Sequence, residues 1–179
     1  MTTASKITMV RLVMIPLFFV TMLWNFTGHM WVSLAIFILA SVTDFLDGYI
    51  ARKYNQVSNF GKFVDPLADK LLTTAAFLIF VQWGQMPAWA AMIILAREFA
   101  VTGLRLIAVE NGRVIAAAWS GKVKTAVSIV AICVMLTDFH SIAVGSITVD
   151  TICWVVMVIL TLYSGAEYFI KNKDVLSFQ

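Results

Sequence analysis

Six runs of apolar residues follow one another along the chain, separated by shorter polar or charged stretches. They lie at roughly 7–24, 30–52, 66–83, 88–109, 121–138 and 148–170. Most are close to the about 20 residues that an α-helix needs to cross the hydrocarbon core of a bilayer. The pattern predicts an all-α, polytopic membrane protein with six transmembrane helices.

Composition agrees with this pattern. The chain has 179 residues, of which 61% are hydrophobic and 13% are charged, with a mean hydropathy of +0.90. This length suits one domain over residues 1–179. The net charge of +3 is not gathered in a basic groove interleaved with exposed aromatics, so nucleic acid is excluded as a partner. Cys133 and Cys153 both lie inside apolar runs, where cysteine behaves as a small hydrophobe.

Basic residues give the orientation. In the six-helix topology all 13 lysines and arginines lie toward one side. The connections at 25–29, 84–87 and 139–148 lie on the other side and contain none. Because cytoplasmic segments carry the excess of Lys and Arg, both termini and both long loops are predicted to be cytoplasmic.

The region 44–69 carries four aspartates in two pairs, Asp44 with Asp47 and Asp65 with Asp69. On a helix the first pair shares one face with Gly48 and Ala51, and the second pair shares one face with Gly61. Fourteen residues separate each pair from the opposite end of its apolar run, Met30–Thr43 and Lys70–Trp83. Both pairs are therefore expected at one depth, in the cytoplasmic half of the bilayer.

Four carboxylates at one level would repel one another unless cations lay between them. The oxygen ligands, without His or Cys nearby, favour Mg²⁺, Mn²⁺ or Ca²⁺ over zinc. Small residues at Gly48, Ala51 and Gly61 would pack helices closely or let a pyrophosphate approach the backbone, and both roles remain open. The aspartate pairs thus predict a divalent-metal site.

Basic side chains also fall within the apolar runs. Arg97 and Arg105 are eight residues apart, about 80° around a helix, so both can address one cavity. Lys122 and Lys124 enter from the next helix, although as positive-inside anchors they would need no further role. We therefore expect a polar cavity, open to the cytoplasm and walled by the second to fifth helices. A basic cluster apart from the aspartates suits an acceptor with its own phosphate.

The spacing of the acidic region matches a known signature. The string Asp44-x2-Asp47-Gly48-x2-Ala51-Arg52-x8-Gly61-x3-Asp65-x3-Asp69 resembles the complete signature of the CDP-alcohol phosphotransferases. The six-helix pattern fits the same family along the whole chain. Nearer the N-terminus, Thr8 and Arg11 match the family's Leu-Thr-x-x-Arg stretch, although Ser5 stands where asparagine is usual.

This resemblance implies roles for the residues that match it. A phosphatidyl or related group would pass from a CDP-alcohol to an acceptor hydroxyl, with release of CMP and with Mg²⁺ or Mn²⁺ as cofactor. The metal ligands would be Asp44, Asp47 and Asp65. Asp69 would be the general base and could also touch the second metal. The CDP moiety would be held by Asp47, Gly48, Ala51, Arg52 and Gly61.

The blocks AREFAVTGLR (96–105) and GKVKT (121–125) are similar to those of bacterial phosphatidylglycerophosphate synthases. The resemblance implies CDP-diacylglycerol as donor and sn-glycerol 3-phosphate as acceptor. It makes Arg97, Arg105, Lys122 and Lys124 candidate ligands of the acceptor's phosphate. It also implies a homodimer in a bacterial inner membrane. Inositol phosphate, serine or phosphatidylglycerol remain alternative acceptors within the family.

A transporter of divalent cations is an alternative from another class, since acids within the membrane also line ion pathways. That function would need acids spread along a path through the bilayer. Here the aspartates are expected at one depth, and Asp138 and Asp150 lie at the far side without polar steps between. The sequence therefore favours the enzyme.

Overall fold

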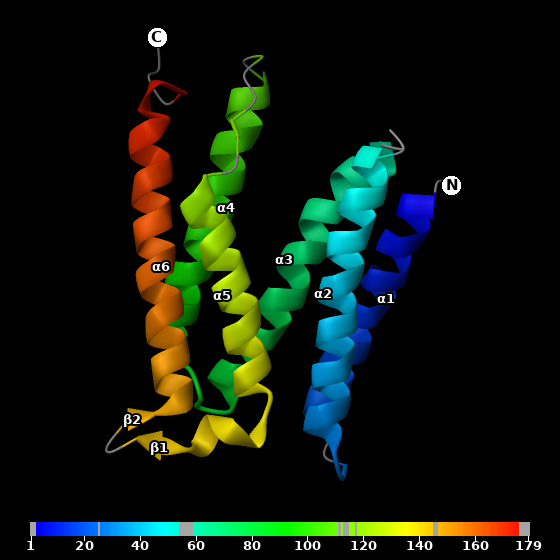
Figure 1. The fold of residues 1–179 in the computed structure, drawn as a ribbon, viewed down its shortest axis with the longest axis vertical. Helices are drawn as coiled ribbons and strands as arrows, with labels where there is room; N and C mark the ends of the chain where they lie inside the picture. The colour runs from blue at the N-terminus through cyan, green and yellow to red at the C-terminus, as the bar shows by residue number, and fades with distance from the viewer. Residues whose placement is uncertain are drawn as a thin grey trace. The chain divides into compact units, whose positions relative to one another are not determined.

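The structure is a computed structural model that describes residues 3–24, 26–53, 59–110, 112, 115–116, 118–144 and 147–175. Within these ranges, the side chains left undescribed are those of residues 3–8, 45–53, 59–66, 69, 110, 140, 144 and 174. The described part contains six α-helices and one short β-hairpin (Figure 1). The predicted all-α fold class with six helices is thus confirmed.

The helices are α1 (Thr3–Leu23), α2 (His29–Lys53), α3 (Asn59–Gln82), α4 (Ala88–Glu110), α5 (Trp119–Met135) and α6 (Val149–Lys171). They follow the predicted runs closely. The exception is α3, which begins at Asn59, ahead of the apolar run that starts near residue 66. This start adds Gly61 and Asp65 to the same helix as Asp69, as the shared face of these residues required.

The chain forms two compact units, and each is described by itself. The N-terminal unit comprises Met1–Trp83 with Leu136–Asp138, and the C-terminal unit comprises Gly84–Met135 with Phe139–Gln179. The aspartate signature belongs to the first unit and the basic candidates belong to the second.

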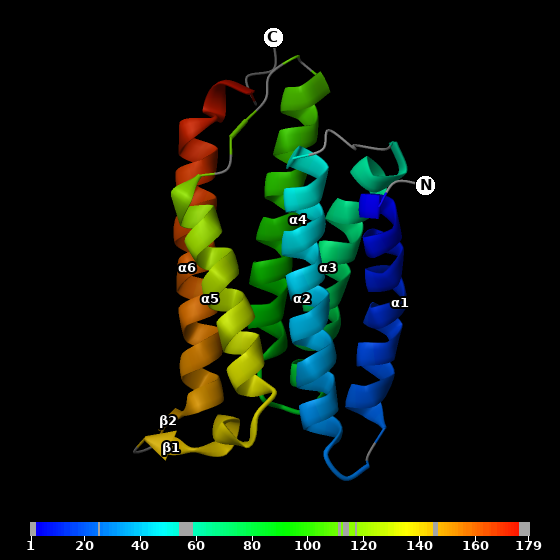
Figure 2. The same cartoon turned by 45° about the vertical axis from the view of Figure 1, so that its right-hand side comes forward.

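In the N-terminal unit, α1 packs against both α2 and α3 (Figure 2). Phe18 of α1 and Phe37 of α2 are fully buried, with ring centroids 5.7 Å apart. The hydroxyl of Ser33 donates to that of Thr21 across the same interface at 2.9 Å. The turn between α1 and α2 uses Gly28 at φ +83°, a conformation that side chains with a Cβ rarely adopt. These contacts align α1 with the helix that carries Asp44.

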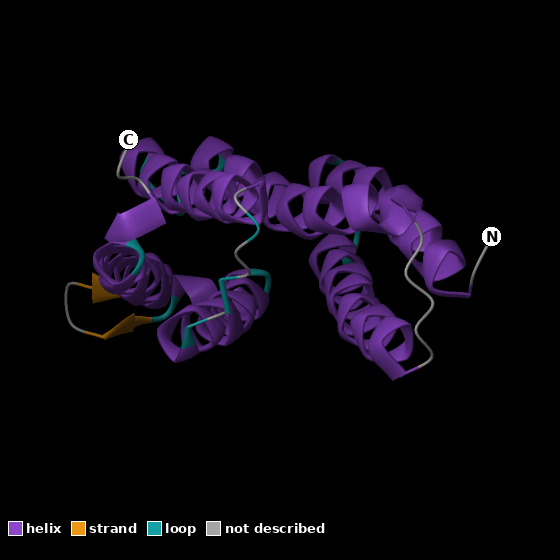
Figure 3. Ribbon diagram, turned by 90° about the horizontal axis from the view of Figure 1, so that it is seen from above, coloured by secondary structure: helices purple, strands orange, loops and turns teal. Residues whose placement is uncertain are grey.

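In the C-terminal unit, α6 packs against both α4 and α5. Trp89 of α4 and Trp154 of α6 meet edge to face, 5.4 Å between ring centroids. Strands β1 (Ala143–Val144) and β2 (Ile147–Thr148) form an antiparallel hairpin beside the start of α6 (Figure 3). Sequence reasoning treated 139–148 as a plain connection and missed this hairpin.

Among the described helices, α6 alone is long and apolar enough to cross a membrane by length and composition. The searched parts of α1, α2 and α3 give shorter apolar stretches, Met9–Leu23, His29–Asp44 and Lys70–Gln82. In α4, Arg97, Glu98 and Arg105 interrupt the apolar run, and α5 has 17 residues. The structure therefore supports six helices, while six spans remain a prediction from sequence.

Candidate active site

The acidic signature lies on two helices of the N-terminal unit. Helix α2 continues unbroken through Asp44, Asp47 and Arg52, and α3 includes Asp65 and Asp69. The backbone therefore gives each aspartate pair the helical spacing that puts its members on one face. Of the signature's side chains the structure describes Asp44; those of Asp47, Gly48, Ala51, Arg52, Gly61, Asp65 and Asp69 lie outside the described residues.

Asp44 is held by an arginine from a neighbouring helix. The Nη1 of Arg11 on α1 donates to Oδ1 of Asp44 at 2.5 Å. The Arg11 side chain is 1% exposed, whereas that of Asp44 is 42% exposed. A buried guanidinium is costly unless paired, so this ion pair fixes the orientation of the carboxylate. Arg11 appeared in the sequence as a motif match without a role.

The described chemistry fits an oxygen-ligated cation. Asp44 presents a partly exposed carboxylate whose orientation is set by a hydrogen bond, and metal-ligating carboxylates are usually held in this way. Among the side chains that the structure describes, no group of three or more His, Cys, Asp or Glu could hold a metal ion. The three further aspartates of the predicted site are not among them. The metal ligands thus stay a prediction.

A carboxylate joins two cations in the C-terminal unit. Oε1 of Glu98 accepts hydrogen bonds from Nη1 of Arg97 at 3.2 Å and from Nζ of Lys124 at 2.6 Å. The Lys124 side chain is 6% exposed and that of Arg97 is 13% exposed. The Glu98 carboxylate offsets the repulsion between the two cations and holds both of them at one oxygen. Arg97 and Lys124, two of the four predicted phosphate ligands, are thereby brought together.

Arg105, a third candidate, is anchored by a tyrosine. Its Nε donates to the hydroxyl of Tyr168 on α6 at 2.8 Å, and its guanidinium carbon lies 5.4 Å from the centre of that ring. Tyr168 is buried with Val101 and Leu104 of α4. Sequence reasoning missed Tyr168, since one tyrosine inside an apolar run carries no signal of its own.

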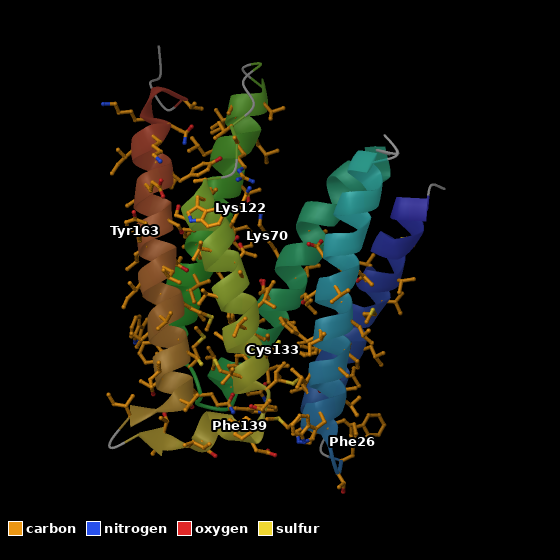
Figure 4. All side chains as sticks on the ribbon, in the orientation of Figure 1. Phe26, Lys70, Lys122, Cys133, Phe139 and Tyr163 are labelled. Atoms are coloured by element: carbon orange, nitrogen blue, oxygen red, sulfur yellow. The ribbon has the colours of Figure 1, made fainter. Side chains whose placement is uncertain are left out.

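Lys122 and Lys124 have different environments. Lys124 is buried against Glu98, whereas Lys122 is exposed on the first turns of α5 (Figure 4). Residues two positions apart lie about 200° apart around a helix, so the two lysine side chains leave α5 on different faces. The structure therefore groups Lys124 with Arg97 and leaves Lys122 as a separate surface cation.

The comparisons with known proteins decide the family. A family model for CDP-alcohol phosphatidyltransferase matches residues 1–166, which include most of both units. The chain belongs to the CDP-alcohol phosphatidyltransferase family. This confirms the resemblance seen in the aspartate signature, and it identifies the chain as a member of a family of membrane enzymes.

Relatives within this family share most of their length with the chain. It is 44% identical to the CDP-diacylglycerol–glycerol-3-phosphate 3-phosphatidyltransferase of Bacillus subtilis (strain 168), over 96% of the chain and 95% of that protein. It is 37% identical to the probable phosphatidylglycerophosphate synthase of Mycobacterium tuberculosis (strain H37Rv), over 92% of the chain and 78% of that protein. An enzyme of Salmonella typhimurium (strain LT2), with the same name as that of Bacillus, is 35% identical over 92% of the chain and 91% of its own length.

Proposed function

We propose that this protein transfers the phosphatidyl group of CDP-diacylglycerol to sn-glycerol 3-phosphate, giving phosphatidylglycerophosphate and CMP. It thereby acts in phospholipid biosynthesis. The observation that carries this assignment is the 44% identity to the Bacillus enzyme over nearly the whole chain. The complete aspartate signature agrees with it, and so do the two cations that Glu98 joins in the C-terminal unit. Family membership also decides against the cation transporter considered above.

The donor side of the reaction is assigned to the N-terminal unit. Asp44, Asp47 and Asp65 would hold Mg²⁺ or Mn²⁺, which when bound would neutralise charge on the pyrophosphate and on the leaving CMP. Arg11 orients Asp44 for this task through the bond at 2.5 Å. Asp47 would also contact the CDP moiety, together with the four further residues of the signature, Gly48, Ala51, Arg52 and Gly61.

Asp69 is assigned as the general base, and it would also contact the second metal. It takes the proton from the acceptor hydroxyl that attacks, while the oxygen of that hydroxyl bonds to the phosphorus that carries the diacylglyceryl group. The bond from this phosphorus to the CMP oxygen breaks, and CMP leaves with the electron pair. An alcohol is a weak nucleophile until its proton is removed, which is why a carboxylate at this place speeds the reaction.

The acceptor's phosphate is assigned to the C-terminal unit. Arg97, Arg105, Lys122 and Lys124 are the proposed ligands, since arginine offers a two-pronged donor and lysine a point charge. Arg97 and Lys124 already share one anionic oxygen of Glu98 within 3.2 Å. A phosphate oxygen is the same kind of acceptor, so the two cations are suitably arranged for it.

The setting proposed for this reaction is a bacterial inner membrane crossed six times. Both termini and the polar cavity that holds the site would face the cytoplasm, because all 13 basic residues are expected there. The protein would act as a homodimer, as the family resemblance implies.

The test is the acceptor dependence of CMP release. Membranes containing the protein are supplied with CDP-diacylglycerol and Mg²⁺, and CMP is measured with each candidate acceptor in turn. We expect release with sn-glycerol 3-phosphate and none without an acceptor. Release with serine, inositol phosphate or phosphatidylglycerol, but not with glycerol 3-phosphate, would move the assignment to another branch of the family. Membranes without the protein are the control.

A further inference from the structure

Helix α6 contributes no predicted substrate ligand, yet a buried stripe of small and polar residues runs along it. Thr161, Ser164, Gly165 and Tyr168 recur at the three- and four-residue spacing of one helix face, and all four are buried. Burying polar residues against lipid or aliphatic side chains costs free energy, so their place on an otherwise apolar helix needs an explanation. What two of them touch gives the reason.

Gly165 lies directly against the side chain of Arg97. A Cβ at this position would come within 3.1 Å of Cγ of Arg97 and within 3.8 Å of its Nε. On α5, a Cβ at Gly121 would lie 3.7 Å from Nη2 of the same arginine. The side chain of Arg97 therefore lies close to both α5 and α6, at a glycine of each helix. A Cβ at 165 would therefore press on the stem of Arg97, which must shift by a few tenths of an ångström to make room.

Tyr168 lies one helical turn after Gly165 and fixes the other arginine. Its ring is 2% exposed, whereas Arg105 is an exposed residue of α4. The hydroxyl of Tyr168 accepts from Nε of Arg105 at 2.8 Å. This bond leaves the two terminal nitrogens of the guanidinium as the fork that can face an anion. A rigid, buried tyrosine thus orients a long side chain that would otherwise sample many rotamers.

We propose that Gly165 and Tyr168 are positioning residues for the acceptor, which act by holding Arg97 and Arg105 in the geometry that binds its phosphate. This inference rests on the proposed function, because it takes the two arginines as phosphate ligands. Helix α6 would then determine the affinity for the acceptor without touching it. The donor and the chemical step would depend on it little.

The experiment compares two pairs of variants of the full-length protein. Tyr168→Phe removes one oxygen from the contact with Arg105, and its control is Tyr163→Phe, a tyrosine of the same helix that is 65% exposed. Gly165→Ala pushes on Arg97, and its control is Gly103→Ala on α4, where a Cβ meets nothing within 4 Å. Michaelis constants for glycerol 3-phosphate and CDP-diacylglycerol, and kcat, are measured for all four.

We expect Tyr168→Phe and Gly165→Ala each to raise the Michaelis constant for glycerol 3-phosphate about tenfold. The constant for CDP-diacylglycerol and kcat should stay within about twofold of the unchanged protein, because no donor contact is altered. Both control variants should match the unchanged protein in all three values.

A double-mutant cycle separates positioning from a general loss of structure. In a protein that already carries Arg105→Gln, the change Tyr168→Phe should have no further effect on the acceptor constant. An equal effect of Tyr168→Phe in both backgrounds would overturn the proposal. So would an unchanged acceptor constant, or an equal change in the constants for both substrates. Because Tyr168→Phe creates little strain, it keeps the proposal testable even if Gly165→Ala fails to fold.

Failure of the proposed function would look different. In that case the unchanged protein itself would release no CMP with glycerol 3-phosphate. Turnover by the unchanged protein, with variants that behave like their controls, would refute the role of α6 and leave the function intact.

Discussion

The two units hold their charged side chains by opposite arrangements. In the N-terminal unit a buried cation, Arg11, fixes an anion that is proposed to bind metal, at 2.5 Å. In the C-terminal unit an anion, Glu98, joins a buried lysine and a partly buried arginine that are proposed to bind phosphate, within 3.2 Å. In both, the counter-charge is a residue outside the predicted ligands. The predicted ligands Asp44, Arg97 and Lys124 are thus each held by a neighbour of opposite charge.

The proposed function assigns different steps to the two units. Changes in the N-terminal unit should act on turnover and on the metal requirement. Changes in the C-terminal unit should act on the affinity for the acceptor.

Replacement of Asp69 by Asn should have the largest effect. Without a base to take the hydroxyl proton, kcat should fall by about 10²- to 10⁴-fold, while binding of CDP-diacylglycerol persists. The measurement is CMP release at saturating substrates, alongside direct binding of the CDP-lipid to purified protein. Turnover near that of the unchanged protein would remove Asp69 from its assigned role.

Replacement of Arg11 by Met should have the second largest effect, a loss of metal affinity. Loss of a group that orients a ligand commonly lowers metal affinity by about 10- to 100-fold, so the Mg²⁺ concentration for half-maximal activity should rise by that order. The titration should recover activity at high Mg²⁺, which a simple folding defect would not allow. An unchanged Mg²⁺ requirement would mean that the contact between Arg11 and Asp44 is structural only.

Replacement of Lys124 by Met should act on the other unit. It removes one of the two cations that flank Glu98, and the Michaelis constant for glycerol 3-phosphate should rise about tenfold or more. The Mg²⁺ requirement should not change, which distinguishes this variant from Arg11→Met. A shift in the Mg²⁺ requirement alone would reverse the division between the units.

Replacement of Lys122 by Gln should have the smallest effect. The side chain is exposed, and single exposed charges contribute about 0–1 kcal/mol, so the acceptor constant should change by no more than about fivefold. Comparison with Lys124→Met, two residues away on the same helix, tests whether burial sets the size of the effect. Equal effects at both positions would show that burial does not distinguish the two lysines.

Much of the fold could be predicted because long apolar runs indicate helices. A run of apolar residues has few alternatives to a helix, since only a helix satisfies its backbone hydrogen bonds within one segment. All six helices were therefore expected, and all but the start of α3 lie close to the predicted runs. The hairpin of β1 and β2 was not expected, because it depends on pairing between Ala143 and Thr148 rather than on a pattern of residues.

The candidate site was predictable where spacing alone defines it. The aspartates of 44–69 are predicted ligands, and the intervals between them along two helices are visible in the sequence. Their resemblance to the family signature implies the family, the class of reaction and the roles of the predicted ligands.

Tertiary structure decided which side chains hold these ligands in place. Arg11 meets Asp44 from 33 residues away, and Arg105 meets Tyr168 from 63 residues away. It also decided that Lys124 is buried while Lys122 is exposed, because packing selects one face of α5. Contacts between helices depend on how their surfaces pack, and the spacing of residues in the sequence does not show this packing.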